Sequence, residues 1–294
     1  MDINSTKYKV ESSPAIRSDT ASYDENYILS KSGILNIYGN CTKDEVGKII
    51  REKTQRGIIL IQFGQKFSVE PKLLNLLNTN ILEEFPECRL RTNLNGYGAF
   101  EDLEFLKYLK NLKSLSVELF GESDLSPINK YCKLKDLGIG GDNLRIKEIT
   151  DNKSIENLSV FRKIKDIESI RKMSNLKRLT IIGMTLKNLD FLKELINLKE
   201  LDFKFGGTKN MEVLSQVGKV ESLSFTRVRL LKIENLKPIN QMKFLKKIRF
   251  DTQVHLTNLN WLTNKEIEVQ VENCRNFKGE IINKNDNPNQ LLLF

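Results

Sequence analysis

One short phrase recurs along the chain. Asn-Leu-Lys-x-Leu stands at 111–115, at 175–179 and at 197–201. It belongs to a longer pattern, apolar-x-x-apolar-x5-apolar-x-x-apolar-x-apolar, which fits seven consecutive units whose starts lie 21 or 22 residues apart, with 25 before the seventh. All 35 apolar positions of these units hold apolar residues, in a chain of 294 residues that is 39% hydrophobic overall. This agreement excludes a chance origin and indicates a repeat architecture.

Each unit combines two periods. It ends in strand-type alternation, with polar residues between inward-facing ones, and begins with a spacing that suits a turn of α-helix or 3-10 helix. One unit cannot bury its five apolar side chains alone, whereas stacked units can, at about 1.5–3 kcal/mol for each side chain. The strands are therefore expected to form one parallel sheet with a continuous core behind it. The seven units span 103–117, 125–139, 146–160, 167–181, 189–203, 211–225 and 236–250, and an eighth fits from Leu259 into 267–272 after a one-residue deletion.

In this spacing the sequence resembles the leucine-rich repeat family, especially its short bacterial forms, over about 103–272. The resemblance implies an α/β solenoid, a horseshoe with one parallel β-sheet on the concave face and short helical or 3-10 turns on the convex face. One position departs from the family pattern, which places Asn or Cys three residues after the last inward residue of the strand. No asparagine ladder is expected there, and the turns are expected to be less regular. The position holds Phe120, Asp142, Lys163, Met184, Gly206, Val228 and Gln253.

The N-terminal third has a different pattern, in which predicted strands alternate with predicted helices. Thr42 and Glu45 form a capping box that opens the first helix. The alternation favours a parallel sheet. Two interpretations stay open: the segment is the start of the same solenoid, with helices covering its end, or it is a separate small α/β domain. The predicted strands lie at 33–39, 57–64 and 88–94, and the predicted helices at 42–54 and 68–78.

These patterns divide the chain into four parts. The ends lack the repeat, and the final Leu-Leu-Leu-Phe is expected to tuck against the last repeat. The parts are a flexible N-terminal tail (1–30), an N-terminal α/β capping part of the solenoid (31–102), the leucine-rich repeats (103–277) and a C-terminal tail or cap (278–294).

Charge and cysteine usage bear on the compartment and on the partner. The net charge is +9, and most of the excess lies in residues 101–294, with 34 Lys and Arg against 26 Asp and Glu. The N-terminus has no signal-peptide pattern, and no stretch approaches the roughly 18 apolar residues of a membrane span. The cysteines lie far apart without a C-x-x-C pair, which predicts reduced thiols in a cytoplasmic protein. They are Cys41, Cys88, Cys132 and Cys274, and the high Lys, Asn and Ile content favours a bacterial source.

No residue set predicts catalysis. His255 is the only histidine, and no motif places an acid or a nucleophile beside it. The glycine-rich 138–143 follows a predicted strand but lacks the Lys-Ser/Thr of a phosphate-binding loop, so a tight turn is preferred. Glu83 and Glu84 are interpreted as helix surface, and no spacing is typical of metal ligands. We therefore expect a non-enzymatic protein without cofactor or metal.

Candidate binding residues follow from the register of the stacked strands. Residues between the inward positions face the concave surface, where the middle column is mostly small. Large apolar side chains on an otherwise polar face are candidate hot spots. The alternative is that they fold over the sheet edge and pack against their own turns. The candidates are Phe161, Ile182, Phe205, Arg178, Thr180, Asp202, Lys204, Ser159 and Glu200.

A basic residue also repeats just before the strands. The row comprises Lys113, Lys135, Lys177, Lys199 and Lys246, and Glu156 and Glu221 interrupt it. Such a row is either a solvated face, a contact for an acidic protein, or a contact for phosphates. The absence of interleaved aromatic residues disfavours nucleic acid.

The sequence thus predicts a cytoplasmic, monomeric solenoid that binds another protein. An acidic surface is one form that this partner could take, and neither nucleic acid nor a membrane is expected as a partner. Three roles stay open. The first is a bacterial immunity protein that neutralises a toxin. The second is a regulatory or scaffold subunit of an intracellular enzyme. The third is an exported host-directed effector or adhesin.

Overall fold

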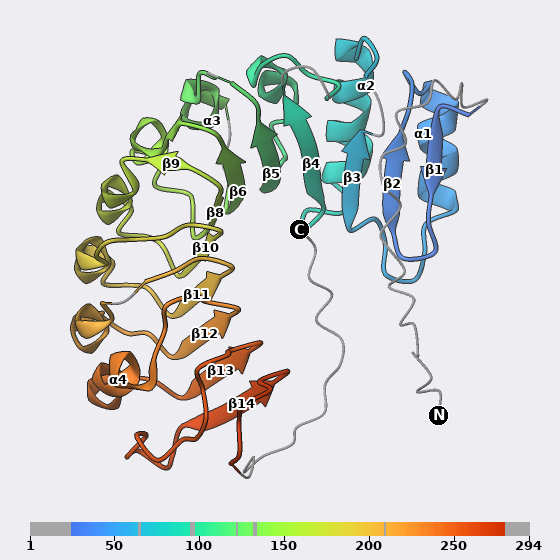
Figure 1. Ribbon diagram of the computed structural model, residues 1–294. Helices are drawn as coiled ribbons and strands as arrows, with labels where there is room; N and C mark the ends of the chain where they lie inside the picture. The colour runs from blue at the N-terminus through green and yellow to red at the C-terminus, as the bar shows by residue number, and fades with distance from the viewer. Residues whose placement is uncertain are drawn as a thin grey trace, which may run out of the picture.

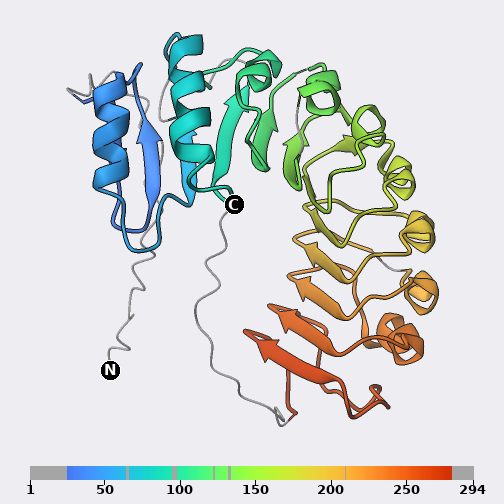
Figure 2. The same cartoon turned by 180° about the vertical axis from the view of Figure 1, so that it is seen from behind.

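The protein is an arc of stacked repeats. The computed structural model describes residues 25–279, apart from 64–65, 95–97, 122, 132–133 and 209. Strands line the inner side of the arc and helical turns line its outer side (Figures 1 and 2). This is the expected leucine-rich repeat horseshoe with its sheet on the concave face, so the predicted fold is confirmed.

A single 12-stranded sheet runs through the described part of the chain. Its strands follow one another in sequence order, and every neighbouring pair is parallel except the first. A separate two-stranded parallel sheet joins β7 (Leu144–Arg145) to β9 (Ile164–Lys165). The strands of the large sheet are β1 (Tyr27–Leu29), β2 (Ile34–Ile37), β3 (Leu60–Phe63), β4 (Arg89–Leu94), β5 (Ser114–Leu119), β6 (Asp136–Gly141), β8 (Asn157–Phe161), β10 (Arg178–Ile182), β11 (Glu200–Lys204), β12 (Ser222–Thr226), β13 (Lys247–Asp251) and β14 (Glu268–Glu272).

The helices are short, and most of those in the repeats are 3-10 helices. The capping box predicted at the start of α1 is present, since the Glu45 amide donates to Thr42 Oγ1 at 3.2 Å and the Thr42 amide donates to the Glu45 carboxylate at 2.6 Å. Within the described ranges, no helix is long and apolar enough to cross a membrane. The helices are α1 (Lys43–Arg51), α2 (Pro71–Leu76), the π-helical η1 (Leu77–Leu82), η2 (Glu104–Tyr108), α3 (Ser126–Tyr131), η3 (Ile146–Ile149), η4 (Ile167–Lys172), η5 (Asp190–Glu194), η6 (Glu212–Gln216), α4 (Ile233–Leu236) and η7 (Lys237–Gln241).

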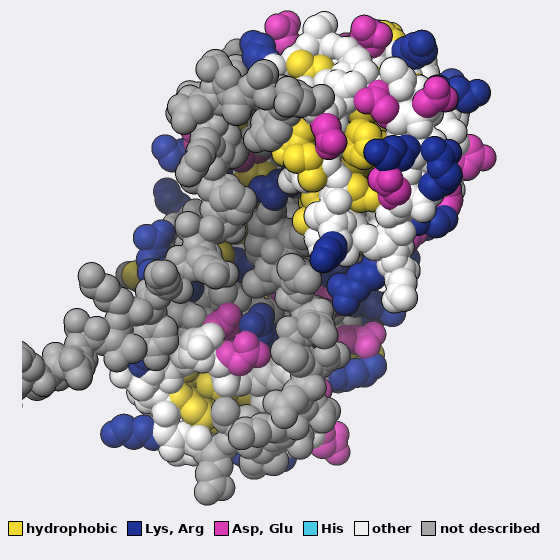
Figure 3. Space-filling view, turned by 90° about the vertical axis from the view of Figure 1, so that its right-hand side faces the viewer, with side chains coloured by type: hydrophobic (Ala, Val, Ile, Leu, Met, Phe, Trp, Pro, Cys, Tyr) yellow, Lys and Arg dark blue, Asp and Glu magenta, His cyan; other side chains and the backbone are white. Residues whose placement is uncertain are grey.

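The N-terminal strands lie in the same sheet as the repeats, because β4 pairs with β5 in parallel register. One expectation needs correction at this end. Tyr27–Leu29 fell within the tail expected over 1–30, but they form β1, antiparallel to β2. Gly33 adopts a φ of 85° between the two strands, which allows the chain to turn back. This end of the arc shows hydrophobic side chains among charged ones (Figure 3). The rest of both predicted tails, 1–24 and 280–294 with the final Leu-Leu-Leu-Phe, lies outside the described residues.

The repeat positions form the core. All 35 apolar positions of the seven units are buried, except that Ile167 is only partly buried. They belong to one hydrophobic cluster that also contains the inward residues of β2, β3 and β4. Each repeat therefore covers the apolar side of the next, as the spacing predicts.

Aromatic side chains replace aliphatic ones in the last repeats. Phe203, Phe225 and Phe250 occupy the same inward position of three neighbouring strands and stack with ring centroids 5.6 Å apart at each step. Trp261 closes the column edge-on, 6.2 Å from Phe250. We refer to these four residues as the aromatic column.

Asparagine side chains bond the turns, but at the opposite end of the strands from the family's usual position. The asparagine of the recurring Asn-Leu-Lys phrase donates its Nδ2 to a backbone carbonyl of the preceding repeat or helix, which explains why the phrase keeps it. After the strands, most repeats use backbone bonds instead, such as the Gly207 amide to the Met184 carbonyl at 3.0 Å. The side-chain bonds are Asn111 to Asn78 (3.2 Å), Asn175 to Lys153 (2.7 Å) and Asn197 to Ser174 (2.9 Å).

Candidate functional site

The strand register brings all nine candidate residues to one part of the concave face, on β8, β10 and β11 and the turn after β11. Three rows of neighbours cross these strands. The rows are Arg178 beside Glu200, then Ser159, Thr180 and Asp202, then Phe161, Ile182 and Lys204. Phe205 follows at the end of β11. We call this set the concave patch.

Phe161 lies against Gly140 of the neighbouring strand β6. A Cβ atom at Gly140 would overlap the ring of Phe161, so this ring covers the bare backbone of β6. The next residue, Arg162, spans the same strand and forms an ion pair with Glu118 on β5. Its guanidinium lies 5.2 Å from the ring of Phe120. Half-buried Phe161 therefore packs on its own sheet and presents its remaining surface to solvent.

Phe205 has the left-handed backbone that the residue after the strand adopts in every repeat from β8 to β14. Its φ is 57°, in the left-handed region that costs a non-glycine residue about 1–2 kcal/mol. Its amide donates to the Thr226 carbonyl at 2.9 Å, which holds the conformation, while 46% of the residue stays exposed. Gly183 occupies the equivalent position after β10 with a φ of 71°. The fold thus accepts glycine at this turn position, and the ring of Phe205 adds exposed apolar surface there.

Charged side chains surround the apolar ones. Arg178 binds Glu200 at 2.6 Å, and this hydrogen bond raises the pKa of Arg178. The hydroxyl of Thr180 donates to the carboxylate of Asp202 at 3.2 Å. Burial raises the pKa of Asp202 although Lys204 opposes the shift, and burial lowers the pKa of Lys204 although Asp202 opposes that shift. Burial on the concave face thus disfavours the charged form of both groups, and each group partly restores the charged form of the other.

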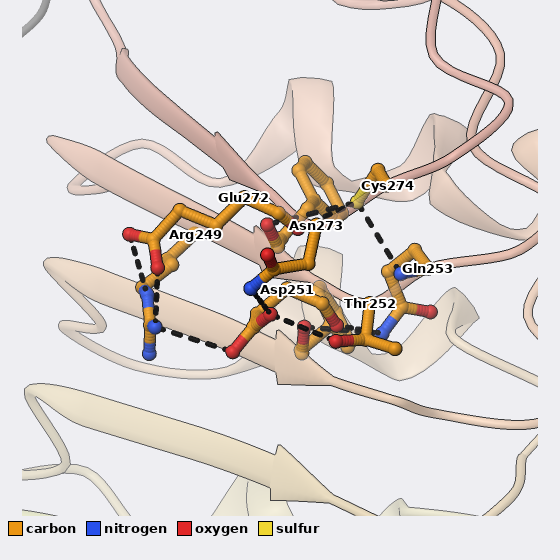
Figure 4. A network of polar contacts seen from close by, with 9 residues as sticks. Arg249, Asp251, Thr252, Gln253, Glu272, Asn273 and Cys274 are labelled. Carbon is orange, nitrogen blue, oxygen red and sulfur yellow. Dashed lines mark hydrogen bonds and ion pairs between the residues drawn. The ribbon is translucent and has the colours of Figure 1, made fainter. Parts of the chain in front are cut away.

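A polar network lies at the C-terminal end of the arc, separated from the concave patch by β12 (Figure 4). Arg249 on β13 binds Glu272 on β14 at 2.8 Å and Asp251 at 3.3 Å. Asp251 also accepts hydrogen bonds from Thr252 Oγ1 at 2.9 Å and Asn273 Nδ2 at 3.0 Å. Sequence reasoning placed Arg249 and Asp251 on the concave face but did not count them among the binding residues. The opposite charges at neighbouring positions of β13 and β14 could have indicated the pair.

Other residues singled out in the sequence lie apart from the concave patch. His255 is exposed in the loop after β13. Cys41 and Cys88 are buried free thiols whose pKa burial raises to about 12, Cys274 is also free, and Cys132 is not among the described residues. The described ranges contain no group of three or more His, Cys, Asp or Glu side chains that could hold a metal ion.

We expect Asp202→Asn to stabilise the fold near neutral pH and to lose this effect in acid. The folded pKa of Asp202 lies above the unfolded value of about 3.9, so the ionised carboxylate destabilises the wild type above the folded pKa. Below the unfolded value the wild-type side chain is neutral in both states, and the difference between the two proteins should shrink. Urea denaturation at about pH 7 and about pH 3.5 measures this difference.

Asp151→Asn, at an exposed carboxylate outside the concave patch, is the matched control and should change little at either pH. A stability difference for Asp202→Asn that is the same at both pH values would contradict the assignment.

Comparison with known proteins finds similarity only among solved structures. No protein-family model matches the sequence, and no curated protein matches it. Internalin C2 of Listeria monocytogenes is 16% identical with a TM-score of 0.47, over 78% of this chain and 91% of that one. A second internalin of the same species is 17% identical with a TM-score of 0.45, over 78% and 88%. A leucine-rich repeat protein of Leptospira interrogans is 15% identical with a TM-score of 0.46, over 79% and 57%. At such identities, no residue's role is transferred to this chain.

Proposed function

We propose that this protein binds a partner protein through the concave patch, without catalysing a reaction. The observation that carries the proposal is Phe205, a large aromatic side chain that stays 46% exposed at the end of β11, beside the apolar side chains of the concave patch. Phe205 is not among the described hydrophobic residues that pack against the core, so a partner is the reason we assign to its ring.

The surroundings of Phe205 support the proposal. Phe161 and Ile182 are register neighbours on β8 and β10, and Phe205 comes directly after their neighbour Lys204 on β11. The Arg178–Glu200 pair lies on the same two strands, β10 and β11. Apolar anchors within a charged surround are the usual anatomy of a binding hot spot. Small residues along the middle column, such as Ser159, leave room for a partner to approach the sheet.

A narrower form of the proposal is that the partner is a toxin and that binding covers its active surface. This role requires a partner whose own activity falls when the complex forms. A regulatory or scaffold role requires a partner enzyme that stays active or changes its rate. The activity of the isolated partner, measured with and without this protein, distinguishes these roles.

We expect Phe205→Gly to weaken partner binding without weakening the fold. The partner is first isolated from the source cells by affinity capture on the wild-type protein. Loss of a hot-spot ring should then raise the Kd at least roughly tenfold in calorimetry, which is about 1.4 kcal/mol. Relief of the left-handed strain and the extra freedom of glycine in the unfolded chain act in opposite directions, so the stability should change by less than about 1 kcal/mol.

Phe244→Ala is the matched control, because Phe244 is 53% exposed and lies in the turn before β13, outside the concave patch. This variant should bind as the wild type does. If Phe205→Gly keeps the wild-type Kd, the concave patch is not the binding site.

A further inference from the structure

A groove lies at the edge where the strands begin, outside the concave patch. Its volume is about 630 Å³, and it extends over the turns that enter β6, β8, β10, β11 and β12. Its lining is polar and strongly basic. The lining residues are Lys135, Lys153, Ser154, Glu156, Asn175, Lys177, Asn197, Lys199 and Lys219. We call this the lysine groove.

One wall of the lysine groove contains three lysines of the basic row noticed in the sequence, Lys135, Lys177 and Lys199, with Glu156 between the first two. Backbone bonds connect its members from repeat to repeat, for example the Lys177 amide to the Glu156 carbonyl at 2.7 Å and the Lys199 amide to the Lys177 carbonyl at 2.8 Å. Neighbouring strands in a sheet lie about 4.8 Å apart, so the side chains of this wall form a regular series. Lys153 and Lys219 line the groove from the preceding turns, where the sequence pattern did not indicate them.

The positive charge of the groove is only partly neutralised. Lys177 binds Glu156 at 2.8 Å, and Lys199 lies 3.7 Å from Glu221. Glu221 also binds Lys246 at 2.6 Å, so its single carboxylate is shared by two lysines.

The remaining three lysines carry the excess charge. Over the described ranges, no ion pair holds Lys135, Lys153 or Lys219. The Lys153 ammonium lies against the backbone carbonyls of Thr150 and Lys172, at 3.5 and 3.3 Å. The groove therefore has a local excess of positive charge that an anionic ligand would neutralise.

The asparagine and serine side chains that line the groove are held by hydrogen bonds within the protein. Asn175 and Asn197 each donate to a backbone carbonyl of the preceding repeat, and the Ser154 hydroxyl donates to Asn152 at 2.6 Å. The ammonium groups that no ion pair holds, those of Lys135, Lys153 and Lys219, are thus the lining groups left to meet a ligand. The ligand would bind through charge, along a surface whose shape is set in advance.

The surroundings favour a polypeptide over a nucleic acid. Among the described residues, no aromatic side chain lines the groove, so bases would find no stacking partner. Glu156 lies among the lysines, where a continuous series of phosphates would be repelled. Ile196, which precedes the lining residue Asn197, is 59% exposed and offers an apolar contact. A polypeptide that combines acidic and apolar side chains can use both features.

We propose that the lysine groove is a second binding site, which takes an extended acidic segment of a polypeptide. The site is separate from the concave patch and does not depend on the function assigned to that patch. Its affinity comes from charge complementarity, so it should fall as salt screens the lysines.

The test uses fluorescence anisotropy with labelled probes at low ionic strength. The probes are a peptide of about 12 residues alternating Glu and Leu, its Gln-for-Glu counterpart and an oligothymidine of about 12 nucleotides, lengths that suit a charged site of this extent. The groove variant is Lys135→Glu, Lys153→Glu and Lys219→Glu, three exposed positions that should leave the fold intact. The control variant is Lys43→Glu, Lys72→Glu and Lys187→Glu, with the same change in net charge at exposed positions outside the groove.

We expect the acidic peptide to bind the wild type, and the Gln counterpart not to bind. The groove variant should lose at least roughly tenfold in affinity and the control variant less than about twofold. Phe205→Gly should keep the wild-type affinity for this peptide, which separates this site from the concave patch. If both charge variants lose affinity equally, binding depends only on the net charge of the protein, and the proposal is overturned. Tighter binding of oligothymidine, lost in the groove variant, would replace it with a nucleic-acid site.

Discussion

Replacing Phe225 with alanine is expected to lower the free energy of unfolding by about 3–5 kcal/mol, the largest single effect we predict. The side chain is fully buried and stacks between Phe203 and Phe250, 5.6 Å from each. The substitution removes its transfer energy and leaves a cavity in the middle of the aromatic column. The rings on both sides lose their partner, and each lost pair accounts for about 0.5–1.5 kcal/mol of this total.

Urea denaturation followed by circular dichroism measures the change. Phe244→Ala is the matched control, since it deletes the same ring at an exposed position and should cost less than about 1 kcal/mol. If the two variants lose similar stability, the aromatic column is not a packing unit and its rings can relax into the space.

Replacing Gln253 with alanine is expected to cost about 2–3 kcal/mol. Gln253 is only 3% exposed, and its Nε2 donates to the backbone carbonyls of Phe225 at 3.1 Å and Asp251 at 3.2 Å. The backbone amide of Gln253 donates a hydrogen bond to Cys274 Sγ at 3.3 Å (Figure 4). Alanine would leave the buried Phe225 carbonyl without this donor, whereas the Asp251 carbonyl still accepts from the Arg227 amide at 2.8 Å.

Two further variants make this second prediction specific. Gln253→Glu keeps the shape but replaces the donor with an acceptor, so it should destabilise at least as much as alanine. Asn273→Gly removes the exposed bond to Asp251 while keeping the left-handed turn, and it should cost less than about 1 kcal/mol. A loss of less than about 1 kcal/mol in Gln253→Ala would show that water or a backbone shift replaces its hydrogen bonds.

The sequence predicts the core of this protein well, because burial is what the repeat spacing encodes. Leu179, Leu201 and Leu223 hold the same position in successive units, and the structure pairs them in one register. A position-by-position match of this kind leaves little freedom to the fold. The apolar period also separates helical turn from strand within each unit.

The turns were less predictable, since their backbone groups can be satisfied in several ways. The sequence lacks asparagine at the family's usual position, and backbone bonds and Gln253 serve there instead. Asn175 and Asn197 do bond the turns, but from the entrance of the strand. Spacing alone does not tell which polar group a side chain reaches.

The candidate site was predictable in its layout and not in its contacts. The repeat register alone places Phe161 and Ile182 side by side on neighbouring strands. Register does not reveal that Phe161 covers Gly140, or that Arg162 reaches Glu118 two strands away. These contacts depend on the choice of rotamer, which the absence of a side chain on β6 permits. The left-handed conformation of Phe205 belongs to the repeat turn, because the residues after the neighbouring strands, Gly183 and Arg227, share it.

The unbranched order of the strands has a mechanical consequence. Because each strand of the sheet pairs only with its immediate neighbours, a force that pulls the two ends of the arc apart is carried in series through every interface. The stiffness of such an assembly is set by its most compliant joint. Among the parallel interfaces, β3 and β4 share the fewest registered residue pairs, three, whereas β4 and β5 share six. Within this parallel part, the arc is expected to yield first between β3 and β4, and the repeats beyond would move as one rigid body.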